Sequence, residues 1–344
     1  MGDSKRRPLA GRRSVLLGMA GLVTATLAAC ADNGRAALPD AAGPGQSTPG
    51  TPPNGPGSGP ATPPPSIAAL SSEQAAAALA AKPGSGEGGS GDTGDVTPVP
   101  PSSASVSAAA IPGKPQILAE FGPLRPQEWG LHVTGVVNNS ASRHVALTFD
   151  ACGGPGGTGC DHKLLKSLRS LNVPATLFIN SRWIAANRSL AAELAADPLF
   201  ELANHGTLHL PLSVNGKSAY GIAGTANPAA VYEELMGNQA LMLELTGVSP
   251  RFFRPGTAFY DEVAASMTRR LGILPVNFTV NGDGGATFAP ATVAGELAKA
   301  AAGDIVISHF NRPGAGTAEG YARALPRLLD RGVTFARLGD VLPV

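Results

Sequence analysis

Aromatic residues are confined to one part of this 344-residue chain. All 17 Phe, Trp and Tyr residues lie at Phe121 or later. Aromatic side chains supply much of the apolar area that a folded core buries. The first 120 residues therefore lack the means to build a core, and residues 113–344 suit a single large domain.

Residues 31–112 are rich in proline and glycine. They hold 15 of the 31 prolines and 13 of the 44 glycines, which is 28 of 82 residues. This share exceeds the roughly 25–30% that marks low-complexity, disordered sequence. We expect a disordered tether that holds the folded domain away from a membrane, within a cell wall.

The first 30 residues have the features of an export signal. Five basic residues precede an apolar stretch at residues 14–29. At about 1.5 Å per residue this stretch falls short of a roughly 30 Å hydrocarbon core, so it predicts a cleaved signal and not a spanning helix. Arg12-Arg13 resembles a twin-arginine export motif, with general secretion as the alternative. Leu27-Ala28-Ala29-Cys30 resembles a bacterial lipobox, which predicts lipid at Cys30 and anchoring on the outer face of the cytoplasmic membrane; an ordinary cleaved signal is the alternative.

Three cysteines are present, and two remain if Cys30 carries lipid. Cys152 and Cys160 lie eight residues apart in a glycine-rich loop. An exported protein meets an oxidising compartment, which favours a disulfide between them. The alternative is that both are metal thiolates.

Charge and motifs exclude several partners. With 26 basic and 25 acidic residues the net charge is +1. The chain therefore has no excess of basic residues to neutralise the phosphates of a nucleic acid, and we expect no nucleic-acid partner. No nucleotide-binding glycine motif follows a predicted strand. We expect membrane contact only through the N-terminal lipid, and, without coiled-coil heptads, a monomer.

The C-terminal part alternates between strand and helix patterns. Repeated strand–helix units predict a parallel sheet, and we expect a distorted (β/α) barrel of about seven parallel strands. An open doubly wound sheet is the alternative. Predicted strands are 144–150, 175–180, 200–204, 252–255, 273–280, 304–309 and 333–338; predicted helices are 161–171, 189–196, 228–246, 260–271, 291–301 and 318–329.

Five reactive side chains fall at or just beyond the carboxyl ends of the predicted strands. Barrel active sites are assembled at that rim from several strands, so we expect these residues to meet there. They are Asp150, His205, Arg254, Asp283 and His309.

A second pattern lies within this set. His205-Gly-Thr-Leu-His209 places two imidazoles four residues apart, where both reach one cation. Neutral imidazole suits zinc and similar ions. The pattern lacks the glutamate of a zincin protease helix.

These motifs, in this order, make residues 144–338 resemble the polysaccharide deacetylases, which are NodB-homology, metal-dependent carbohydrate esterases. The resemblance covers most of the predicted domain. The matching motifs are Thr148-Phe149-Asp150, His205-Gly-Thr-Leu-His209, Arg254-Pro255, Asp283 and Ile307-Ser308-His309.

The resemblance implies a role for each residue. Asp150 is the general base, His205 and His209 bind a divalent metal, expected to be zinc, and His309 is the general acid. Asp283 orients Arg254. The implied activity is hydrolytic removal of N-acetyl groups from a cell-wall or surface amino-polysaccharide similar to peptidoglycan.

The sequence departs from the family pattern at two places. Ala151 stands where the family has a second aspartate that binds the metal. We expect Asp161 to replace it, because a Cys152–Cys160 bridge would fold the loop back towards Asp150; His162 is the rival ligand.

The second departure is in the third motif. Arg254-Pro-Gly-Thr257 lacks the usual aromatic residue, and Tyr260 is expected to take part of that wall.

The alternative function is a non-catalytic, glycan-binding wall lipoprotein that kept the fold and lost the metal through Ala151. Hydrolysis of another amide or an ester at the same site is a third possibility.

Overall fold

The structure is a computed structural model that describes residues 111–343. The predicted export signal, the lipidation site Cys30 and almost all of the predicted tether lie outside the described residues. No helix among residues 111–343 combines the length and apolar character that crossing a membrane requires.

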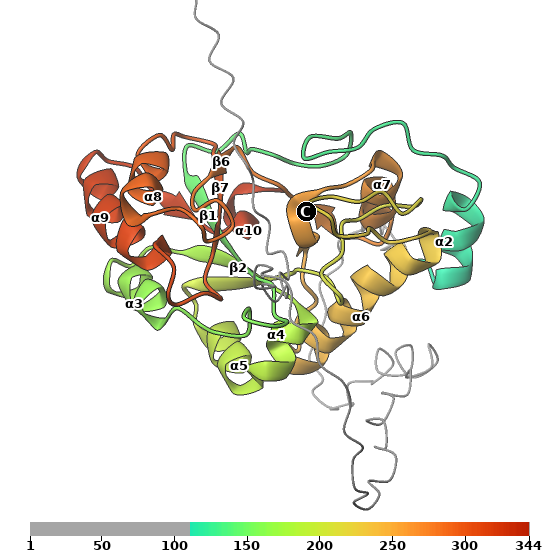
Figure 1. Ribbon diagram of the computed structural model, residues 1–344, viewed down its shortest axis with the longest axis horizontal. Helices are drawn as coiled ribbons and strands as arrows, with labels where there is room; N and C mark the ends of the chain where they lie inside the picture. The colour runs from blue at the N-terminus through green and yellow to red at the C-terminus, as the bar shows by residue number, and fades with distance from the viewer. Residues whose placement is uncertain (1–110, 344) are drawn as a thin grey trace, which may run out of the picture.

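A single parallel sheet forms the centre of the domain (Figure 1). Its strands run in the order β5-β4-β3-β2-β1-β7-β6, and β8 pairs with β1. Because β7 pairs with β1, a strand near the end of the chain lies beside the first strand. The path ends at β5 and β6, so the sheet is a curled half-barrel, as the predicted distorted barrel requires. The strands are β1 (Val145–Ala151), β2 (Ala175–Ile179), β3 (Phe200–Asn204), β4 (Phe252–Phe253), β5 (Leu274–Pro275), β6 (Val280–Asn281), β7 (Ile305–His309) and β8 (Phe335–Ala336).

Helices surround this sheet, with α3, α8 and α9 at one end of the view and α2, α6 and α7 at the other (Figure 1). The longest, α6, begins at a proline after the capping residue Asn227 and ends at Gly247, whose φ of +71° terminates the helix. The helices are α2 (Lys114–Phe121), α3 (His162–Ser170), α4 (Ser181–Ala186), α5 (Arg188–Ala196), α6 (Pro228–Thr246), α7 (Glu262–Arg270), α8 (Pro290–Leu297), α9 (Thr317–Asp330) and α10 (Leu338–Val341), with a short 3-10 turn η1 (Gly256–Ala258).

One predicted strand is divided in two. The sequence predicted a single strand at 273–280, but β5 stays on β4 and β6 joins β7. The chain leaves the first ladder at Asn277, whose side-chain amide donates to the carbonyls of Leu131 and Ala258. This break separates the two edges of the half-barrel.

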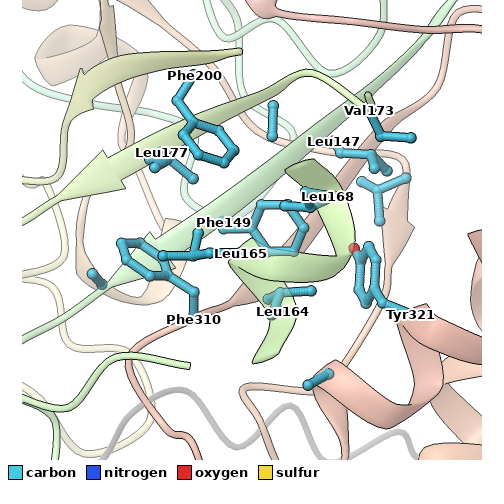
Figure 2. Close-up of a cluster of buried hydrophobic side chains, with 14 of the residues drawn as sticks. Leu147, Phe149, Leu164, Leu165, Leu168, Val173, Leu177, Phe200, Phe310 and Tyr321 are labelled. Carbon is cyan, nitrogen blue, oxygen red and sulfur yellow. The ribbon is translucent and has the colours of Figure 1, made fainter. Parts of the chain in front are cut away.

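Alternation along β1 decides which side chains face the site. Leu147 and Phe149 point into an apolar cluster with α3 and α9, where Phe149 packs against Tyr321 at a centroid distance of 5.0 Å (Figure 2). Successive strand residues point to opposite faces, so Thr148 and Asp150 face the interior of the half-barrel. Both are buried.

Candidate active site

Asp150 lies near the carboxyl end of β1 and is 3% exposed. Its Oδ1 accepts a hydrogen bond from Arg254 Nη1 at 2.8 Å. In the register of the sheet it stands directly beside His309, the last residue of β7. Two of the predicted residues are therefore neighbours on adjacent strands.

Arg254 follows β4 and is fully buried. Besides Asp150, its guanidinium donates to Thr148 Oγ1 at 2.9 Å and to the Asn277 carbonyl at 3.0 Å. It also lies over the Phe178 ring, 4.2 Å from the centroid. These contacts fix a positive charge beside Asp150, where a buried carboxylate needs a partner.

His205 and His209 come together after β3, as the sequence predicted. Their rings meet edge to face with centroids 4.9 Å apart. His205 Nδ1 lies 2.7 Å from the Arg254 carbonyl. A carbonyl only accepts, so Nδ1 carries the hydrogen and the neutral ring presents its Nε2 lone pair to the site. This Nε2 lies 3.8 Å from Asp150 Oδ2.

The turn between the two histidines depends on Gly206 and Glu234. Gly206 has φ +79°, and a Cβ there would lie 2.2 Å from Glu234 Oε1. The buried Glu234 carboxylate accepts from the N–H groups of Leu208 at 2.9 Å and Leu210 at 3.1 Å. Burial raises the pKa of Glu234, and these backbone donors oppose the rise. The carboxylate of α6 thus holds His209 in place from both sides of the turn.

Cys152 is the residue that joins this pair. Its Sγ lies 3.8 Å from His205 Nε2. One ligand atom from each of Cys152, His205 and His209 lies within 4.8 Å of the others, and all three residues are buried. Two imidazoles and a thiolate are donors that suit zinc, so the residues present fit the metal that the family pattern implies.

Asp161 has a different position from the one predicted. Its Oδ1 accepts from the N–H groups of Lys163 and Leu164, both at 3.1 Å, and caps α3. It does not belong to the group of donors around His205 and His209, and neither does His162. An Asp before a helix is a strong capping signal, and Oδ1 takes this local role, whereas the buried Oδ2 has no hydrogen-bond partner among the described residues.

The predicted disulfide is absent as well. Cys152 and Cys160 are not bonded to each other. Cys160 packs into the apolar cluster with Leu164 and Trp183, while Cys152 faces His205. Burial raises the pKa of the Cys160 thiol to about 12. The two thiols therefore have separate environments.

Asp283 and His309 form a second buried pair. Asp283 Oδ1 lies 2.9 Å from His309 Nδ1, and Oδ2 accepts from the His309 backbone N–H at 2.7 Å and from Thr317 Oγ1 at 2.9 Å. The resemblance implied that Asp283 orients Arg254; in the structure it holds His309 instead. The Asp283 carboxylate fixes the orientation of the His309 ring, and Nε2 is the ring nitrogen on the side away from Asp283.

The third motif forms the tight turn η1 against His209. A Cβ at Gly256 would lie 2.1 Å from the His209 carbonyl oxygen. Thr257 has φ +72°, and its buried Oγ1 has no hydrogen-bond partner in the structure. Tyr260, expected to line the site, is instead fully buried and donates to the Phe253 carbonyl at 2.9 Å. The turn therefore places backbone atoms, and not the aromatic ring of Tyr260, against His209.

Part of the chain is similar to a known protein family. Residues 138–276 match the family model described as polysaccharide deacetylase. The match includes Asp150, Cys152, His205, His209 and Arg254, and ends before Asp283 and His309. No curated protein sequence matches the chain.

Two solved structures share the fold with a TM-score of 0.51 each. One is a pseudoenzyme of carbohydrate esterase family 4, BA3943 from Bacillus anthracis; it is 18% identical, and the alignment covers 62% of this chain and 70% of that one. The other is the peptidoglycan N-acetylglucosamine deacetylase Bc1960; it is 20% identical, with 60% of this chain and 92% of that one covered. At such identities the likeness shows the fold alone.

Proposed function

We propose that the chain is a polysaccharide deacetylase, since residues 138–276 match that family model, and that it hydrolyses N-acetyl groups of an amino-polysaccharide with the help of a divalent metal. One observation carries the proposal. Asp150 and His309 stand side by side on β1 and β7, and the His205–His209 pair adjoins Asp150. The residues to which we assign the roles of base, acid and metal ligands are therefore close together at one rim of the sheet.

Hydrolysis of an acetamide requires two proton transfers. The nucleophilic water must lose a proton, and the amine must gain one before it leaves. The Asp150 carboxylate, fixed by Arg254, takes the first proton. His309 Nε2, on the side of the ring away from Asp283, donates the second.

His205 and His209 would hold a divalent metal, which would supply the Lewis acidity that polarises an acetamide carbonyl and lowers the pKa of a water molecule. Negative charge that develops on the carbonyl oxygen requires nearby N–H donors. The turn at Gly256 and Thr257 packs against the His209 backbone, and we assign this donor role to its N–H groups.

The substrate class is tested by acetate release. Zinc-loaded protein is incubated with peptidoglycan, with N-acetylglucosamine oligomers and with an acetyl ester of similar size. We expect acetate from the N-acetylated glycans, and none from samples that carry His205→Ala. Release from the ester alone would replace the amide with an ester as the substrate.

A non-catalytic, glycan-binding role is the second candidate. Two observations favour it: Ala151 has no ligand atom, and one protein of the same fold is a pseudoenzyme. Glycan binding without acetate release, in protein that holds no metal, would establish this role.

We also propose that the protein is an exported monomer, anchored by lipid at Cys30 on the outer face of the cytoplasmic membrane. The sequence of residues 1–30 supports this location, and the substrate proposed here lies there. Labelling with a radioactive fatty acid should mark the wild-type chain and not Cys30→Ala. Equal labelling of both chains would contradict the lipobox.

A further inference from the structure

We propose that Cys152 is the third protein ligand of the metal, beside His205 and His209, in place of the carboxylate that Ala151 lacks. The metal site is then a two-nitrogen, one-sulfur centre that selects zinc over oxygen-preferring ions such as magnesium. This inference rests on the metal dependence in the proposed function and adds to it the identity of the ligand.

The first support is the orientation of the donors. His205 Nδ1 is engaged by the Arg254 carbonyl, so its other nitrogen, Nε2, is the one that faces Cys152 Sγ at 3.8 Å. His209 closes the triangle, with every ligand atom within 4.8 Å of the others. Zinc–sulfur and zinc–nitrogen bonds of about 2.3 and 2.0–2.1 Å fit a triangle of this size.

The second support is the backbone that aims the thiol. Ala151, the last residue of β1, packs with Phe149 in the apolar cluster, so the next side chain turns towards the site. Gly153 then has φ +66°, and a Cβ there would lie 2.5 Å from the backbone nitrogen of Trp183. Arg182 Nη2 also donates to the Cys152 carbonyl at 3.1 Å. These contacts fix the direction of the Cys152 side chain.

The third support is the chemistry of the alternatives. Asp161 caps α3 through Oδ1 and lies outside the group of donors around the two histidines, and Asp150 Oδ1 is engaged by Arg254. Among residues 111–343, only Cys152 completes a group of three donors with the two histidines. A thiolate is a soft donor that favours zinc, whereas magnesium and calcium require oxygen ligands.

Cobalt substitution tests the inference without reference to activity. The full chain carries Cys30→Ser, so that Cys152 and Cys160 are the only thiols. Cobalt(II) is added to this protein, to Cys152→Ser and to Cys160→Ser, and metal content and absorption are recorded. Cys160→Ser is the matched control, because that thiol lies eight residues away in the apolar cluster.

We expect one cobalt per chain and a thiolate-to-cobalt charge-transfer band in the near ultraviolet for the parent and for Cys160→Ser. Cys152→Ser should lose the band and bind cobalt at least 10-fold more weakly. Cys152→Asp should bind cobalt without the band. In competition with zinc, magnesium should bind to Cys152→Asp better than to the parent.

Each opposite result has a distinct meaning. One bound cobalt without a charge-transfer band, or a band that survives in Cys152→Ser, overturns the assignment of Cys152 and leaves metal-dependent hydrolysis standing. If magnesium displaces zinc from the parent as readily as zinc displaces magnesium, the assignment of Cys152 is also contradicted. This comparison needs no variant. The absence of bound metal in the parent would refute the inference and the proposed function together.

Discussion

The charged side chains of the site are paired, and each pair has a separate task. Arg254 fixes the Asp150 carboxylate, and Asp283 fixes the His309 ring. Both pairs are almost completely buried, so each carboxylate depends on its partner. The residues proposed as base and acid are thus positioned independently.

Arg254→Gln should leave Asp150 buried without its charge partner. We expect the free energy of unfolding to fall by about 3–5 kcal/mol, as measured by urea denaturation. Arg251→Gln is the control, because its ion pair with Glu201 is half exposed and worth about 0–1 kcal/mol. Equal decreases in the free energy of unfolding for the two variants would show that the buried ion pair stabilises the protein no more than the half-exposed pair does.

Asp283→Asn should remove the group that fixes His309. We expect kcat to fall about 100-fold or more with little change in KM, because general acid catalysis contributes about 10²–10⁴-fold. Thr317→Val, which removes only one contact of the same carboxylate, should lose much less. A large rise in KM at unchanged kcat would instead place Asp283 in substrate binding.

At the scale of elements, α6 supports the proposed metal site through one side chain. Glu234 reaches from this helix to two N–H groups that flank His209. Groups that hold metal ligands in place typically affect metal affinity 10–100-fold. The packing of α6 is therefore linked to the chemistry of the site.

Glu234→Gln should weaken metal binding, because an amide offers one acceptor oxygen where the carboxylate uses two. We expect zinc affinity to fall about 10-fold or more in a competition titration with a chelator. The control Glu233→Gln changes the exposed neighbour on the same helix and should leave affinity unchanged. Matching affinities in all three proteins would remove Glu234 from the metal site.

Much of the fold follows from local sequence patterns. The alternation of β1, the apolar face of α3 and the proline and glycine that bound α6 all occur where the sequence predicts them. The strand predicted at 273–280 was wrong in one respect, because Asn277 makes long-range hydrogen bonds that no local pattern reveals.

The site was predicted less completely. Strand ends bring Asp150, His205 and His309 together because parallel strands share a rim. The sequence did not reveal Cys152 as a partner of the two histidines, because the direction of a side chain after a strand depends on the following turn. The sequence feature that pointed towards Cys152 was the alternative in which both cysteines are metal thiolates.

At the scale of the whole molecule, metal binding should stabilise the domain. A metal that binds only the folded state adds about 2.7 kcal/mol at 100 times its Kd. We expect zinc to raise Tm and a chelator to reverse the rise, with no response in His209→Ala. A zinc-dependent rise that persists in this variant would place the metal elsewhere.

The first helix of the described residues is α2. Ile117 and Phe121 of this helix are buried in a cluster with α7, and Lys114 pairs with Glu233 of α6. We therefore expect limited proteolysis to cut within the predicted tether and to leave a stable fragment that starts close to Lys114. A tether that resists protease would contradict the disorder predicted for residues 31–112.

The central claim is that Asp150 and a metal at His205 and His209 hydrolyse the acetamide of a glycan. The most direct test measures bound zinc and acetate release from peptidoglycan on the same samples of wild type and Asp150→Asn. We predict about one zinc in both proteins, and acetate release that falls at least 100-fold in the variant. Zinc in both with equal acetate release would contradict the role of Asp150, and zinc without acetate release in the wild type would contradict the activity itself.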